Sequence, residues 1–129
     1  MLLFVEEMDV KQLNFYTAKA INLCLQREVT DSSQHVYVDL NQYGGCGSRV
    51  WCPTVAWDDF GSLMIHFRPS INWNRDSCLV EIFEQNCLEG HKGKPRKSYI
   101  TCHYDVRIAL CKAVVAYCFG SSFDSENIK

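Results

Sequence analysis

Cysteine and histidine are the residue types in this chain that could most directly support chemistry. The 129 residues include eight cysteines and four histidines, which in proteins bind zinc or form thiolate–imidazole pairs for covalent catalysis. The short-range groupings are Cys46 with Cys52, Cys87 with His91, and Cys102 with His103. Structural zinc sites usually combine two closely spaced ligand pairs, whereas only Cys87 and His91 have such spacing here and no CxxC occurs. No nucleophile-elbow pattern surrounds any cysteine, so we predict no metal, no cofactor and no catalytic residue.

Acidic pairs offer a second route to chemistry. Asp58 and Asp59 are adjacent, and Glu81 and Glu84 are three residues apart. Paired carboxylates can perform acid–base catalysis or hold a cation. Carboxylates are also the usual residues of solvated turns and helix faces. We favour this second interpretation for both pairs.

A basic loop at residues 91–97 is the third candidate. The segment combines glycines with lysines, but Pro95 stands where the helix of a phosphate-binding loop would begin, so it is not a P-loop. Its cationic side chains could instead contact nucleic acid or a nucleotide, and they are Lys92, Lys94, Arg96 and Lys97. We retain nucleic-acid or nucleotide binding through this loop as the alternative function.

Composition limits the other possibilities. The formal net charge is −2 and 47% of the residues are hydrophobic. No overall positive field would attract a phosphate backbone, and the negative charge is too small for a DNA mimic. The length suits one compact core and is too short for two ordinary domains.

The beginning of the chain and the placement of its cysteines indicate the compartment. Residues 1–5 are apolar, but Glu6 and Glu7 follow at once, so we expect neither a signal peptide nor a membrane span. Most cysteines lie among aliphatic residues in helix-like segments, where a thiol behaves as a small hydrophobic group; these are Cys24, Cys78, Cys87, Cys111 and Cys118. We therefore predict reduced cysteines and a cytoplasmic protein.

The first half of the chain predicts a helix followed by a hairpin. Asp9 and Gln12 have capping-box spacing before a helix at roughly 10–26, although Asn14 is an alternative N-cap. Alternating apolar residues predict a strand at 36–40. The glycine-rich segment 44–48 predicts a turn, and residues 49–57 the returning strand.

The second half predicts two further strands and two helices. A third strand at 63–67 is expected to stop at Pro69. Ser70 or Asn72 would then cap a helix that ends at Gly90. A fourth strand follows at 99–104, and a last helix at 106–119 is capped by Asp105 and stopped by Gly120, with Arg107 and Lys112 available to solvent.

These elements predict one α+β domain at residues 8–120. The expected architecture is a single α/β sandwich, with an antiparallel sheet of about four strands and three helices packed on it. Residues 1–7 would be an N-terminal extension or an additional edge strand. Residues 121–129 are polar and are predicted to form a frayed tail.

Two motifs carry a resemblance to a known family. The segment Phe67-Arg68-Pro69-Ser70-Ile71-Asn72-Trp73 and the helix at 108–120, with Ala109, Cys111 and Gly120, resemble small bacteriophage and prophage proteins. That family includes the NinX-like accessory proteins and the phage α-β-α sandwich domains. The resemblance covers roughly residues 8–124, although Asp105-Val106 stands where the family usually has Thr-Pro, and Lys112 where an arginine is common.

The resemblance implies a phage accessory protein expressed in the bacterial cytoplasm, without catalytic residues to carry over. The middle segment contains more aromatic residues than one small sheet needs, so some are expected to be exposed as binding anchors. We assign this partner-binding role to Trp51, Trp57 and Phe60. The function predicted is binding of a host or phage protein, for instance to inhibit a defence system such as CRISPR. The oligomeric state is left open.

Overall fold

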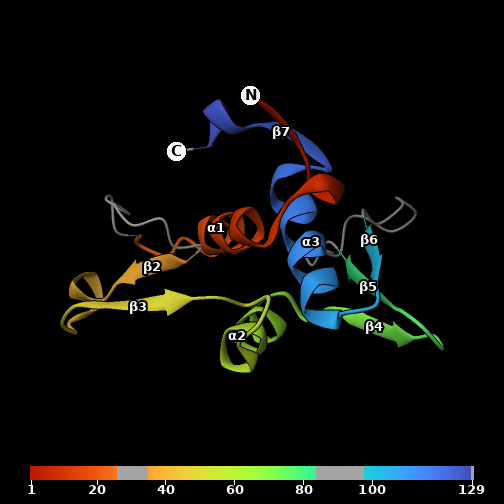
Figure 1. The fold of residues 1–129 in the computed structure, drawn as a ribbon, viewed down its shortest axis with the longest axis horizontal. Helices are drawn as coiled ribbons and strands as arrows, with labels where there is room; N and C mark the ends of the chain where they lie inside the picture. The colour runs from red at the N-terminus through yellow and green to blue at the C-terminus, as the bar shows by residue number, and fades with distance from the viewer. Residues whose placement is uncertain (26–34, 84–97, 129) are drawn as a thin grey trace, which may run out of the picture.

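A computed structural model describes residues 1–25, 35–83 and 98–128. Within these ranges the α+β class is confirmed, with three α-helices and several short antiparallel strands. The strands do not form one sheet of about four strands. The described residues instead form three small sheets, with two, two and three strands, and Figure 1 shows them arranged around the helix α3.

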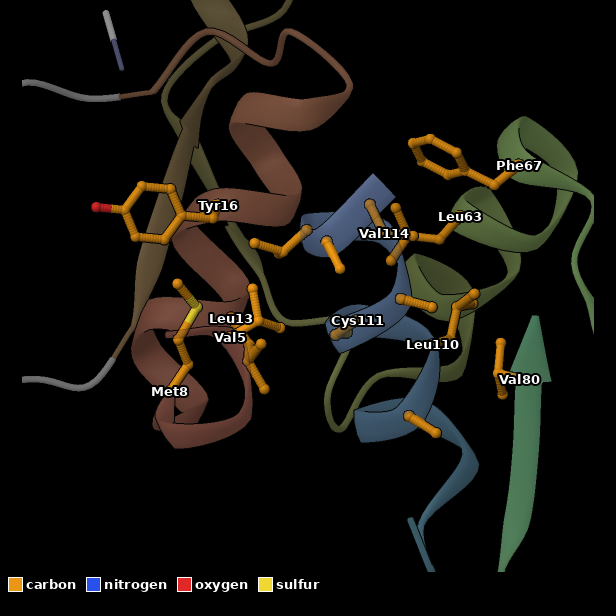
Figure 2. Close-up of a cluster of buried hydrophobic side chains, with 14 of the residues drawn as sticks. Val5, Met8, Leu13, Tyr16, Leu63, Phe67, Val80, Leu110, Cys111 and Val114 are labelled. Carbon is orange, nitrogen blue, oxygen red and sulfur yellow. The ribbon is translucent and has the colours of Figure 1, made fainter. Parts of the chain in front are cut away.

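Helix α3 (Val106–Phe119) organises the core. It packs against α1 (Val10–Ala20), α2 (Trp57–Phe67) and the strands β5 (Cys78–Phe83) and β6 (Ser98–His103). Side chains on several of its faces are fully buried, and they include Leu110, Cys111, Val114 and Val115. Figure 2 shows that α1 contributes to this core on one side of α3, while α2 and β5 contribute on the other. One continuous core therefore surrounds α3.

The predicted helix ends are confirmed where a local cap defines them. The Asp9 carboxylate accepts from the Gln12 backbone N–H at 2.8 Å, and the Gln12 side chain accepts from the Asp9 N–H at 3.1 Å. This is the predicted capping box. The helix ends at Ala20 rather than near residue 26, because the chain turns into the left-handed region at Asn22 (φ 58°).

The predicted hairpin is also confirmed, although its second strand is shorter than expected. Strands β2 (Val36–Asp39) and β3 (Ser48–Trp51) pair antiparallel. Gly44 and Gly47 between them have φ values of 80° and 83°. An L side chain would be strained in that conformation, so glycine is suited to both positions.

The central segment contradicts the sequence prediction. The expected strand at 63–67 is the second half of α2, and the expected helix after Ser70 is the strand pair β4 (Ser70–Trp73) and β5. Leu63 and Phe67 alternate as in a strand, but they are also one helical turn apart, and both are buried in the helix. The segment Phe67–Trp73 therefore joins a helix to a strand, in the reverse of the predicted order.

The cysteine positions also differ in part from the prediction. Cys78 is in strand β5, and Cys24 follows the end of α1, so neither lies in a helix. Cys111 and Cys118 are in α3 as expected, and Cys87 lies outside the described residues. All seven cysteines in the described part of the chain have free thiols.

The two terminal segments pair with each other. Strand β1 (Leu2–Phe4) is antiparallel to β7 (Ser122–Asp124), and Leu3 lies opposite Phe123 with both side chains buried. The N-terminal segment thus forms a strand, as one alternative expected, but it pairs with β7 and not with the edge of a larger sheet. The predicted frayed tail is wrong for residues 122–124, because Phe123 joins the core. Lys112 is likewise buried rather than available to solvent, and it forms an ion pair with Glu6 at 3.4 Å.

Candidate protein-binding surface

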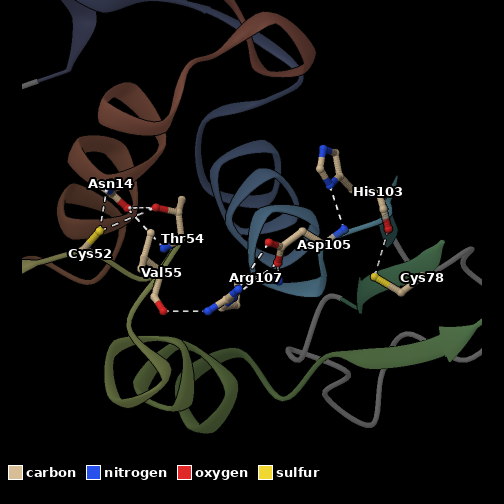
Figure 3. A network of polar contacts seen from close by, with 8 residues as sticks. All are labelled: Asn14, Cys52, Thr54, Val55, Cys78, His103, Asp105 and Arg107. Atoms are coloured by element: carbon tan, nitrogen blue, oxygen red, sulfur yellow. Dashed lines mark hydrogen bonds and ion pairs between the residues drawn. The ribbon is translucent and has the colours of Figure 1, made fainter. Parts of the chain in front are cut away.

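Cys78, His103 and Asp105 meet at the end of the three-stranded sheet, a grouping that the sequence analysis did not identify. Figure 3 shows that their contacts are not those of a nucleophile and its base. Cys78 Sγ donates to the His103 carbonyl oxygen at 3.2 Å, and His103 Nδ1 accepts from the Asp105 backbone N–H at 2.9 Å. Burial raises the pKa of the Cys78 thiol, and the nearby Cys102 and Asp105 raise it further. The thiol is therefore protonated near neutral pH, and this arrangement does not activate it.

The other candidates for chemistry do not assemble into a site within the described ranges. No group of three or more histidine, cysteine or acidic side chains there could hold a metal ion. Cys102 and His103 are consecutive in β6, so their side chains point to opposite faces of the sheet. Glu81 is in strand β5. Glu84 and the pair Cys87 and His91 lie outside the described residues.

Asp59 attaches α2 to the hairpin. Its carboxylate accepts from the Cys52 backbone N–H at 2.9 Å and forms an ion pair with Arg49 at 2.8 Å. The side chain is almost fully buried, and both carboxylate oxygens are used. Asp59 therefore has a structural role and is not a free carboxylate for acid–base chemistry.

The loop between β3 and α2 is fixed from the other side by α1. The Asn14 carbonyl Oδ1 accepts from Thr54, from the hydroxyl at 3.1 Å and from the backbone N–H at 3.4 Å. Asn14 and Thr54 are both buried. Because buried hydrogen bonds are costly to break, this loop presents the start of α2 in a defined position.

Arg107, near the start of α3, connects this loop to Asp105, the N-cap of α3. Its Nη1 donates to the Val55 carbonyl oxygen at 2.7 Å, and its Nε lies 3.4 Å from the Asp105 carboxylate, as Figure 3 shows. Burial alone would raise the pKa of Asp105. Hydrogen bonds from the Arg107 side chain and backbone, together with the guanidinium charge, outweigh that effect and lower the pKa below its usual value.

Trp57 is the exposed centre of this region. Its indole is 60% exposed, although the Arg107 guanidinium lies over its ring at 4.4 Å from the centroid. Phe60, which is half-buried, contacts the same indole edge to face at 5.3 Å. We call this region, made of Val55, Trp57, Phe60 and Arg107, the Trp57 surface. It contains two of the three aromatic residues to which the sequence assigned partner binding.

Trp51 does not belong to that surface, and its predicted role as an exposed anchor is wrong. Its side chain is 1% exposed, and its indole N–H donates to the Thr17 hydroxyl at 3.1 Å. Trp51 therefore fixes the hairpin to α1. Trp73 is 67% exposed at the end of β4, outside the Trp57 surface.

The basic residues of the alternative function lie outside the described residues. They are Lys92, Lys94, Arg96 and Lys97. The nucleic-acid hypothesis for this loop therefore stays a prediction.

Comparisons with known proteins identify no family for this chain. No protein-family model matches it. A stretch of 81 residues, 63% of this chain, is 31% identical to part of "Histidine kinase P4" from Formosa agariphila, and the match covers 6% of that kinase. Because the match covers so little of the kinase, it assigns no kinase activity to this chain.

No helix in the described ranges is long and apolar enough to cross a membrane.

Proposed function

We propose that this chain is a small phage accessory protein that acts by binding a host or phage protein through the Trp57 surface, without catalysing a reaction. Its proposed place of action is the cytoplasm of the bacterial host. The finer proposal is that the bound protein belongs to a bacterial defence system such as CRISPR, which the chain inhibits. The phage assignment rests on the sequence resemblance described above.

The main support for the binding proposal is that the Trp57 side chain is mostly exposed although neighbouring side chains hold it in place. Burying a large indole removes much apolar area from water, and tryptophan and arginine are the residue types most often dominant in protein interfaces. Arg107 and Phe60 already hold the ring of Trp57. A partner would therefore lose little side-chain entropy when it covers this ring.

A capture experiment with a matched control tests the surface. The tagged wild-type chain, Trp57→Ala and Trp73→Ala would each be incubated with host lysate, and the enriched proteins identified. Both tryptophans are more than half exposed, but Trp73 lies on β4, outside the Trp57 surface. We expect a partner that is retained by wild type and Trp73→Ala and lost with Trp57→Ala. Equal retention by all three proteins would refute a role for this surface.

Phage infection tests the finer proposal. The chain would be expressed in bacteria with an active CRISPR system that targets the infecting phage, and in matched bacteria without that system. We expect the chain to raise plaque numbers only in the first strain, and Trp57→Ala to abolish the effect. No increase in that strain would exclude inhibition of the tested system.

A further inference from the structure

The outer face of α2 carries one row of apolar residues. The inner face buries Leu63 and Phe67 against the core. The opposite face presents Trp57, Gly61 and Ile65 at intervals of four residues, which places them in one row. Ile65 is 76% exposed and Trp57 is 60% exposed. Within the described residues this row is covered only in part, by Arg107 and Phe60 at Trp57. The second apolar face of α2 is therefore suited to another partner.

No described residue requires glycine at Gly61, in the middle of this row. It is not among the described glycines with positive φ, and a Cβ added to it would meet nothing within 4 Å. Glycine inside a helix is less favourable than alanine. The missing side chain leaves room for another backbone to approach closely at the centre of the face.

The row is symmetric about Gly61. In an antiparallel pair of α2 helices with the two-fold axis at this glycine, Trp57 of each chain lies opposite Ile65 of the other, since both are four residues from the axis. Each contact then occurs twice, as a two-fold interface requires. A second copy of this chain therefore supplies the complementary apolar side chains.

Residues of opposite charge stand at the two ends of α2, as an antiparallel pair of these helices would require. Exposed Asp58 lies in the first turn, and exposed Arg68 follows the last residue of the helix. Neither forms an ion pair with another described residue. In the antiparallel pair, Asp58 and Arg68 of opposite chains lie on the same side of the axis, roughly 6 Å apart along the helix. An arginine side chain can span that distance.

We infer that a second copy of this chain docks on the outer face of α2, forming an antiparallel two-fold dimer centred on Gly61. The inference rests on the proposed function in that the same face binds protein. It adds that, in the absence of the partner, the face is covered by another copy. The partner and the second copy would then compete for Trp57.

Sedimentation velocity of the purified chain across micromolar concentrations tests the dimer. One helix face is a small interface, so we expect a weak dimer that dissociates on dilution within this range. Ile65→Gln should weaken the dimer about tenfold or more, whereas Ile100→Gln, which alters another exposed isoleucine on β6, should leave it unchanged. Circular dichroism melts would verify that both variants are folded.

A charge exchange tests the antiparallel register. Asp58→Lys and Arg68→Glu should each weaken self-association about fivefold, because each places like charges together twice. A mixture of the two variants should form a heterodimer as tight as the wild-type dimer, since both opposite-charge contacts return. Dimers that respond to neither Ile65→Gln nor the charge changes would overturn the inference, as would a strictly monomeric wild type. In the monomeric case, Trp57-dependent capture of a partner would still support the proposed function.

Discussion

The guanidinium group of Arg107 lies over the indole of Trp57, with 4.4 Å between the guanidinium carbon and the ring centroid. The same group donates to the Val55 carbonyl oxygen at 2.7 Å. One side chain of α3 thus holds both the loop that precedes α2 and the first residue of α2. This relationship makes Trp57 an ordered side chain that is still mostly exposed.

Replacing Arg107 should therefore lower the stability of the fold. We expect Arg107→Ala to lower the free energy of unfolding by about 1–2 kcal/mol, because it removes the cation–π contact and a charged hydrogen bond. Arg107→Lys should recover only part of that loss, since an ammonium group cannot contact the ring, Val55 and Asp105 in the same planar arrangement. Urea unfolding followed by fluorescence measures the change. Identical unfolding curves for wild type and Arg107→Ala would contradict this role.

Truncation of the two tryptophans at the ends of the hairpin-to-helix loop should change stability by very different amounts. Trp51→Ala should cost about 3–5 kcal/mol, because it removes a fully buried indole. Trp57→Ala should change stability by less than about 1 kcal/mol, since its indole is mostly exposed. Urea unfolding of both variants measures the difference. A large loss with Trp57→Ala would mean that its ring serves the fold rather than a partner.

The error at α2 arose because two periodicities shared the same residues. Leu63 and Phe67 face the same side in a strand, where they are two alternations apart, and in a helix, where they are about one turn apart. Only Ile65 between them distinguishes the two patterns. As a strand residue Ile65 would face the core, but in the helix it is exposed. Another signal was present: Pro69 directly follows the helix C-cap Arg68, a common position for proline.

The error at β5 has a related cause. Leu79, Ile82 and Phe83 have helical spacing, but Cys78, Val80 and Ile82 alternate, and these three are the side chains buried in the strand. The β-branched residues at 80 and 82 favoured the strand.

The features that were predicted correctly are mostly short-range. The caps at Asp9 and Asp105 and the glycine turn are examples, because each depends on neighbouring residues. The contact between Trp57 and Arg107 joins residues that are far apart in the sequence, so no local sequence pattern predicts it. The sequence could therefore nominate Trp57 as an anchor but could not distinguish it from Trp51, whose burial depends on α1.

Thiol reactivity should follow burial. Cys78 and Cys111 are fully buried, and burial raises the pKa of both thiols. Exposed thiols, such as Cys24, Cys46 and Cys102, should react within minutes with a maleimide under native conditions. Peptide mass spectrometry after a timed reaction would assign the sites. Cys78 and Cys111 should be labelled only after the addition of denaturant, and their rapid native labelling would contradict the described core.

The acid side of the stability profile should depend on Asp105. Its carboxylate accepts the Arg107 backbone N–H at the start of α3, and its pKa in the folded protein is lowered. An aspartate in the unfolded chain has a pKa of about 3.9. The ionised group therefore stabilises the fold above that pH, and the contribution is lost as the pH falls through the lower folded-state value.

Asp105→Asn isolates this effect, because asparagine is also a good N-cap but does not ionise. We expect wild type to exceed Asp105→Asn in unfolding free energy by about 1 kcal/mol at pH 6, through its charged contacts with Arg107. The difference should shrink as the pH falls below about 4. Comparing the two proteins by urea unfolding at each pH cancels the titration of all other groups. Asp76→Asn, which makes the same change at an exposed position in the β4–β5 turn, is the control for the substitution itself. A difference for Asp105→Asn that is constant from pH 6 to pH 3 would show that the Asp105 charge contributes nothing to the link between α3 and the Trp57 surface.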